Sequence, residues 1–99
     1  MKIVYTAAAR SDLPAIGEWL AAHYPALASV VERCMREVVA HIAGWPQSAP
    51  RVAGRTGVHV VHLGRFPYKI FYRLTTDTVE ILDIRYSEQR PGDERFVAG

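Results

Sequence analysis

The segment from Pro25 to Gly44 constrains the fold more than any other part of the sequence. Apolar side chains recur there at helical spacing and form one continuous stripe, while charged side chains occupy the opposite face. Pro25 suits the first turn of a helix, and Gly44 with Pro46 ends it. A helix with so apolar a face needs a sheet to pack against. The stripe consists of Leu27, Val30, Val31, Cys34, Met35, Val38, Val39 and Ile42.

Three runs rich in β-branched and aromatic residues follow Gly57 and would supply that sheet. They cover residues 58–63, 68–74 and 79–86, and the two segments between them are short enough for hairpin turns. Consecutive runs with short connections predict neighbouring antiparallel strands. We therefore expect a three-stranded antiparallel meander in the second half of the chain.

Side chains alternate between the two faces of a strand, so the middle run divides into two sets. Two cations flanking an aromatic ring on one face could bind nucleic acid or an acidic protein segment, and the alternative is an ordinary solvated face. That set is Lys69, Phe71 and Arg73. The set expected to contact the helices is Tyr68, Ile70, Tyr72 and Leu74.

The first quarter of the chain predicts a strand and another helix. Residues 2–6 are β-prone and could form an edge strand. Residues 8–23 carry apolar side chains at helical spacing, and Tyr24-Pro25 ends this helix because the residue before a proline is disfavoured in the α region. The apolar positions are Leu13, Ile16 and Leu20.

These elements together predict the fold class α+β, with an N-terminal strand, a two-helix hairpin and a three-stranded antiparallel meander. Residues 47–57 are rich in polar residues, glycine and proline and are expected to be a loop. Residues 94–97 would form at most a helical turn. We expect a single domain over residues 1–99.

The composition limits which function classes are open. With 49% hydrophobic and 22% charged residues, the chain is typical of one compact domain whose functional site would be shallow and open. Cys34 is the lone cysteine and no Cys/His cluster has metal-ligand spacing, so we expect no disulfide, metal or cofactor. The sequence contains neither an export signal nor a membrane-spanning run, which predicts a cytoplasmic protein.

Charge is distributed unevenly although the net charge is only +2. The stretch from Val38 to Thr76 contains five cations and no aspartate or glutamate. Such asymmetry favours an anionic partner, either nucleic acid or an acidic protein segment. The cations are Arg51, Arg55, Arg65, Lys69 and Arg73.

The order of elements and several local strings resemble the RelE/ParE toxin superfamily, and its ParE-like branch in particular. The most specific string is Gly64-Arg-Phe-Pro-Tyr68-Lys-Ile70-Phe-Tyr72-Arg73. The others are Ala9-Arg-Ser-Asp12-Leu13-Pro-Ala-Ile16-Gly-Glu-Trp19-Leu20, Gly44-Trp45-Pro46 and Val79-Glu-Ile-Leu-Asp-Ile84 followed by Arg90-Pro91. The resemblance spans nearly the whole chain.

This resemblance implies a toxin of a type II toxin-antitoxin system, a class connected with growth arrest and plasmid stabilisation. A cognate antitoxin would neutralise the toxin by wrapping a C-terminal segment around it in a hetero-oligomer. A segment that orders on binding can cover a large area of a small protein. An acidic or amphipathic segment would complement the basic stretch.

The resemblance leaves two targets open, and with them the question of enzymatic activity. RelE-like members cleave mRNA on the ribosome without a metal, using cations that stabilise charge as the ribose 2′-hydroxyl attacks. The candidates for such a site are His62, Lys69, Arg73, Arg85 and Arg90. The set looks incomplete, because RelE-like nucleases tend to carry Lys and Arg where this chain has His59 and His62, and often a His near the position of Tyr86.

ParE-like members instead inhibit DNA gyrase by binding it, and the sparse catalytic set fits this branch better. A diverged binding module without toxicity is the third alternative. Residues expected to contact the target or the antitoxin are Trp19, Arg65, Lys69, Phe71, Arg73 and Arg90. Trp19 belongs to this set because it lies off the apolar stripe of its helix.

Other reactive side chains have simpler interpretations. His59 and His62 are an odd number of residues apart, so they would point to opposite faces of a strand and could not easily share a metal. Cys34 is expected to be a buried thiol rather than a nucleophile.

Overall fold

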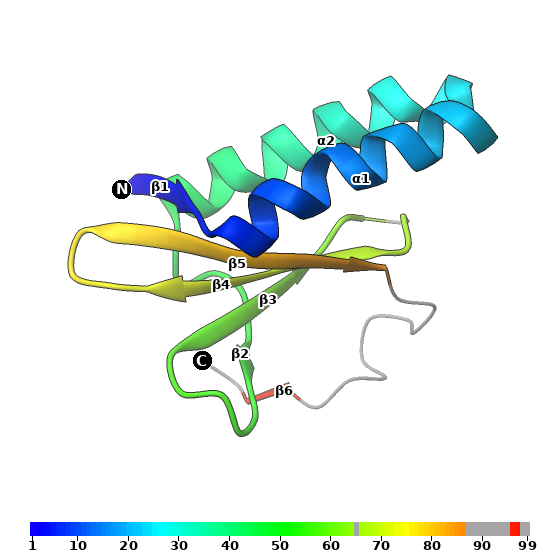
Figure 1. The fold of residues 1–99 in the computed structure, drawn as a ribbon. Coiled ribbons are helices and arrows are strands. Elements are labelled where there is room, and N and C mark those ends of the chain that lie inside the picture. Colours follow the sequence, from blue (N-terminus) through cyan, green and yellow to red (C-terminus); the bar gives the residue numbers. More distant parts are fainter. Residues whose placement is uncertain (65, 87–95, 98–99) are drawn as a thin grey trace.

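A computed structural model describes residues 1–64, 66–86 and 96–97. Two helices pack side by side over one face of a six-stranded sheet whose strand order is β1-β5-β4-β3-β2-β6 (Figure 1). The predicted α+β class and order of elements are confirmed. The elements are β1 (Lys2–Tyr5), α1 (Ala7–His23), α2 (Pro25–Gly44), β2 (Arg51–Val52), β3 (Val58–His62), β4 (Tyr68–Leu74), β5 (Thr78–Tyr86) and β6 (Phe96–Val97).

The meander forms as predicted and is the centre of the sheet. β3 pairs with β4, and β4 with β5, in the antiparallel sense. β1 pairs in parallel with β5 and lies at one edge of the sheet. A parallel neighbour needs a crossover connection, and the α1–α2 hairpin with the following segments supplies it.

Two expectations about irregular segments were wrong. Residues 51–52, expected in a loop, form β2, which pairs with β3. Residues 96–97, expected in a helical turn, form β6, which pairs antiparallel with β2. A strand of two residues is too short to show an alternation of apolar and polar side chains in the sequence. It is a strand only because it pairs with a distant segment.

Both helices begin and end where local chemistry requires it. The Thr6 side chain caps α1 by accepting a hydrogen bond from the Ala9 N–H at 3.2 Å. Tyr24 ends α1 and Pro25 opens α2, as the restriction on residues before proline predicts. The hairpin therefore reverses direction within one residue, which places α1 beside α2.

The main core lies between the helices and the sheet. The predicted inward set of β4 is found there: Tyr68, Ile70 and Tyr72 are buried and Leu74 is partly buried against them. Most of the α2 stripe also packs here, whereas Val30 is not part of the core and Leu27, near the beginning of the helix, is 41% exposed. The end of the helical hairpin where α1 passes into α2 extends past the sheet (Figure 1).

A smaller apolar cluster occupies the opposite face of the sheet. Val58, Val60 and Phe71 are buried there, and Val52 and Leu82 pack against them. The sequence places Phe71 on this face correctly, but the ring is only 5% exposed. The open cation-and-aromatic face that we expected is therefore partly a second core.

Candidate functional site

A row of basic side chains crosses three strands on the face opposite the helices. In the strand register His62 lies opposite Lys69, and Lys69 lies opposite Arg85. Residues in such a row point to the same face, with side chains close enough to interact. Three of the five nuclease candidates from the sequence are thus brought together.

Three cations surround the ring of Phe71, which is next to this row. The charged groups of Arg55, Lys69 and Arg85 lie 5.2, 5.4 and 5.3 Å from the ring centroid. A cation–π contact contributes about 0.5–1 kcal/mol at an exposed site and more where water is excluded, and Lys69 is buried, with 9% of its surface exposed. Since the ring is 5% exposed, it holds the cations in place and has no open face on which a base could stack. We call Phe71, Arg55, Lys69 and Arg85 the Phe71 cluster.

Carboxylates balance part of this positive charge. The Arg85 Nε donates to Asp83 Oδ2 at 2.9 Å, and Arg73 Nη1 lies 3.7 Å from Glu80 Oε1. Both arginine side chains are about half exposed, so these pairs contribute little to stability. Their main effect is to fix where each guanidinium lies and to reduce the net charge that it offers to a ligand.

Burial and neighbouring charges shift the pKa of two basic groups in the row. Burial, and secondarily the charge of Arg85, lowers the pKa of Lys69, while Asp83 acts in the opposite direction. Burial lowers the pKa of His62 below 6.5, and the charge of Lys69 adds to the effect. The imidazole of His62 is therefore mainly neutral at pH 7. It could accept a proton there, whereas Lys69 and the arginines could bind an anion.

A β-bulge in β5 brings Asp83 and Arg85 onto this face. Phe71 pairs with Asp83 and Tyr72 pairs with Ile81, so Leu82 is an extra residue in β5. The insertion shifts the alternation by one position, and Ile81 and Ile84 both reach the helix-side core although they are three residues apart. Without it, Asp83 and Arg85 would follow Ile81 onto the helix side.

The remaining candidates from the sequence are distributed differently. Arg73 shares the face with the Phe71 cluster but pairs with Glu80. Trp19 is 46% exposed on α1, which covers the other face of the sheet, and it stacks on His23 at 4.5 Å. Arg65 and Arg90 lie outside the described residues.

The sequence did not place Arg55 or Asp83 at this site, but it correctly separated the two strand histidines. Arg55 precedes β3 in a segment without periodicity, so only the basic stretch indicated it, and Asp83 is placed by the bulge. His59 lies on the helix side, where it stacks on Tyr72 at 5.1 Å and its Nδ1 lies 2.8 Å from the Ala49 carbonyl oxygen. His62 lies on the opposite face, as predicted.

An apolar cleft of about 630 Å³ opens on the helix side of the molecule. It lies between the α1–α2 hairpin and strands β4 and β5, and its walls include Leu20, Met35 and Ile84. Glu32 and Arg36, whose side chains lie 3.9 Å apart, stand at the cleft as well. The cleft has the size and polarity of a site for an apolar side chain or a small amphipathic segment.

The described part of the chain contains neither a metal site nor a membrane-spanning helix. Residues 1–64, 66–86 and 96–97 contain no group of three or more side chains suited to a metal ion. Among the same residues, neither helix is long and apolar enough to span a membrane.

Comparisons with known proteins place these features in context. The sequence profile described as "ParE toxin of type II toxin-antitoxin system, parDE" matches residues 3–91. The solved structure of the chromosomal ParDE TA system from P. aeruginosa is 27% identical, covers 89% of this chain and 97% of its own, and superposes with a TM-score of 0.76. The isolated E. coli RelE toxin is 13% identical over 90% of this chain and 86% of its own, with a TM-score of 0.67. A search of curated protein sequences finds no significant match.

Proposed function

Because the chain belongs to the ParE toxin family of type II toxin-antitoxin systems, we propose that it arrests growth by binding DNA gyrase and that a cognate antitoxin neutralises it. The Phe71 cluster is the proposed target-binding surface. The observation that carries this proposal is the gathering of Arg55, Lys69 and Arg85 around one buried ring. Cations held in fixed positions recognise an anionic surface with little loss of side-chain entropy.

The charge balance of this face favours binding over catalysis. Stabilising a pentacovalent phosphate requires cations aimed at the developing charge and not already compensated. Two of the nuclease candidates, Arg73 and Arg85, are paired with carboxylates of β5. Paired charges still give specificity to a protein–protein or protein–DNA contact, because they fix where an incoming anion can approach.

The antitoxin is proposed to use the apolar cleft as well as the basic stretch. An amphipathic segment could place apolar side chains against Leu20, Met35 and Ile84 in the cleft. Acidic residues farther along the same segment would contact the cations of the opposite face. Covering both surfaces at once would explain how one partner blocks target binding.

Purified protein added to gyrase, ATP and plasmid DNA tests the proposed target. We expect supercoiling to be inhibited or cleaved plasmid to accumulate, and Lys69→Ala to reduce the effect at least tenfold because it removes one member of the Phe71 cluster. Lys2→Ala is the matched control, since Lys2 is exposed on the edge strand β1 and lies opposite Thr78, at the other end of β5 from Arg85. Normal supercoiling at saturating wild-type protein would reject gyrase as the target.

Ribosome-dependent mRNA cleavage is a second candidate, favoured by the row of His62, Lys69 and Arg85. A neutral histidine beside two cations could remove the 2′ proton while the cations stabilise the phosphate. Toeprinting of mRNA in a translating extract separates the two proposals. New cleavage products that disappear with His62→Gln would support this alternative, and intact mRNA would exclude it.

A further inference from the structure

Strand β5 loses its outer strand partner in the middle of its length. The parallel pairing with β1 ends at Tyr5 opposite Ile81, and the Thr6 N–H donates to the Ile81 carbonyl oxygen at 3.0 Å as its last backbone contact. β5 continues to Tyr86. Among the described residues, no strand pairs with this side of β5 beyond Ile81, and its backbone groups face α1 instead. Partly buried backbone groups in such a position need other hydrogen-bond partners.

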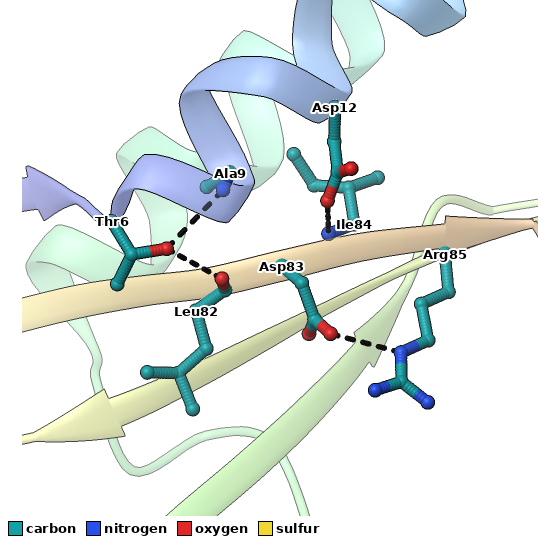
Figure 2. Close-up of polar contacts among 7 residues, drawn as sticks. All are labelled: Thr6, Ala9, Asp12, Leu82, Asp83, Ile84 and Arg85. Atoms are coloured by element: carbon teal, nitrogen blue, oxygen red, sulfur yellow. Dashed lines mark hydrogen bonds and ion pairs between the residues drawn. The ribbon is translucent and has the colours of Figure 1, made fainter.

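Two side chains from the beginning of α1 take the place of the missing strand. The Thr6 hydroxyl donates to the Leu82 carbonyl oxygen at 2.6 Å while it caps the helix. Asp12 Oδ2 accepts a hydrogen bond from the Ile84 N–H at 3.1 Å. Figure 2 shows both side chains reaching β5 from the helix.

These two contacts hold the residues on either side of Asp83. Thr6 binds Leu82, which precedes Asp83, and Asp12 binds Ile84, which follows it. Leu82 is also the extra residue of the bulge. Asp83 and Arg85 extend away from α1 and pair with each other (Figure 2). Arg85 in turn lies over Phe71 at 5.3 Å. A continuous chain of contacts thus runs through the sheet from α1 to the Phe71 cluster.

We propose that Thr6 and Asp12 are positioning residues for the Phe71 cluster: by fixing the β5 backbone on both sides of Asp83, they hold the bulge that directs Asp83 and Arg85 toward Phe71. The inference rests on the proposed function only in taking this cluster to be the target-binding surface. The effect of Thr6 and Asp12 on the position of Arg85 does not depend on any target.

The physical reason is that the bulge decides which face of the sheet the β5 residues after Leu82 point to. A register in which Leu82 is accommodated differently would turn Asp83 and Arg85 toward the apolar helix side. Burial of two charged groups opposes that change, so loss of the α1 contacts would loosen residues 82–85 rather than flip them. Loosening spreads the Arg85 guanidinium over many positions and weakens its contact with Phe71.

Asp12→Ala and Thr6→Val remove the contacts, whereas Asp12→Asn and Thr6→Ser keep a side-chain oxygen that can make them. Glu18→Ala is the matched control, because Glu18 is an exposed carboxylate on the same helix. The ¹⁵N–¹H signal of Arg85 Nε reports the position of the guanidinium, and hydrogen exchange of the Ile84 amide reports the α1 contact. The Val60 amide, in the centre of the sheet, serves as the internal reference for global stability.

In Asp12→Ala and Thr6→Val we expect the Arg85 Nε signal to move to the shift of a solvated arginine. In Asp12→Ala the Ile84 amide should also exchange about tenfold faster relative to Val60. Asp12→Asn, Thr6→Ser and Glu18→Ala should resemble the wild type. Target inhibition should fall with the Arg85 signal and return with it in the conservative variants.

A purely structural role for the two residues makes a different prediction. Exchange at Ile84 and Val60 would then rise together while the Arg85 signal kept its native shift, and this result would overturn the inference. So would failure of Asp12→Asn to restore the Arg85 signal. Because the NMR measurements need no target, wild-type protein that leaves gyrase unaffected would reject the proposed function and leave the positioning role to be judged separately.

Discussion

The hydroxyl of Tyr72, on the central strand β4, donates a hydrogen bond to the carbonyl oxygen of Pro46 at 2.7 Å. Pro46 lies just after α2, so this bond ties the end of the helix to the centre of the sheet. His59 stacks on the same phenol ring from β3. The two aromatic residues thus hold residues 46–49 against the sheet before β2 begins.

Stability should therefore fall at alkaline pH. Burial raises the pKa of Tyr72 to about 12, and a hydrogen bond from the Ala49 backbone offsets part of that effect. Folding favours the protonated phenol, so Tyr72 stabilises the fold. This contribution to the free energy of unfolding is fully present below the unfolded pKa of about 10 and is lost between pH 10 and 12. We expect a loss on the order of 2 kcal/mol in urea unfolding across that range.

Tyr72→Phe is the variant that checks this assignment. It should be less stable than the wild type at pH 7 by roughly 1–3 kcal/mol, because the Pro46 carbonyl oxygen loses its donor. Its alkaline loss should also be smaller than that of the wild type. An identical alkaline profile in the two proteins would show that another group causes the effect.

Two glycines should respond to alanine in opposite directions. Gly64, in the turn between β3 and β4, has a φ of +57°, which an L-residue adopts at a cost of about 1 kcal/mol. Gly17 lies within α1, where alanine is better than glycine by about 0.5–1 kcal/mol. A Cβ at either position would meet no atom within 4 Å, so no clash obscures the backbone effect.

Urea unfolding of Gly64→Ala and Gly17→Ala measures both effects. We expect the first variant to be less stable and the second more stable than the wild type. Destabilisation by Gly17→Ala would mean that the cleft beside it closes in solution and that the added methyl group meets a neighbour there.

The sequence predicted the long elements because their apolar periods are local. Helix α2 and strands β3, β4 and β5 each carry enough residues for the 3.6 or 2.0 period to be recognised. Strands β2 and β6 were missed because each contains two residues and exists only through pairing with a distant segment. Whether residues 1–99 make up one domain stays a prediction.

The candidate site could be predicted only in part, for a related reason. Alternation along β4 placed Lys69 and Phe71 together on the correct face. It could not indicate that Phe71 would be buried, because the residues that cover the ring come from other elements. Alternation counted along β5 fails at Leu82, where the bulge shifts the phase and brings Asp83 and Arg85 to the site.

The titration of His62 should reveal its contact with Lys69. Burial and the charge of Lys69 lower the pKa of the imidazole below 6.5. Folding favours the neutral form, so the stabilisation from His62 is fully present above the unfolded pKa of 6.5 and is lost as the pH falls through the lower pKa of the folded state. The His62 Cε1–H signal in NMR should therefore titrate with a midpoint below 6.5.

Lys69→Met separates the two causes of this shift. We expect the midpoint to rise in the variant but to stay below 6.5, because burial is the larger cause and persists. His23 is exposed on α1 and serves as the internal reference. A His62 midpoint that does not move would show that the Lys69 ammonium lies elsewhere in solution.

Trp19 is predicted to contact the target or the antitoxin, and its position allows the antitoxin contact to be tested without disturbing the fold. Its side chain is 46% exposed and packs mainly on His23 and Tyr24 at the end of the helical hairpin. Trp19→Ala should change the free energy of unfolding by less than about 1 kcal/mol. An exposed tryptophan at the centre of an interface, in contrast, often contributes 2 kcal/mol or more to binding.

Titration calorimetry with the cognate antitoxin measures this difference. We expect Trp19→Ala to raise the Kd at least about 30-fold, which corresponds to a loss of about 2 kcal/mol of binding free energy. Trp45→Ala is the control, because Trp45 is 66% exposed and stacks on His41 at 5.3 Å at the other end of α2. Equal weakening by both variants would indicate a general effect of losing a surface aromatic, and an unchanged Kd for Trp19→Ala would remove this end of the hairpin from the antitoxin interface.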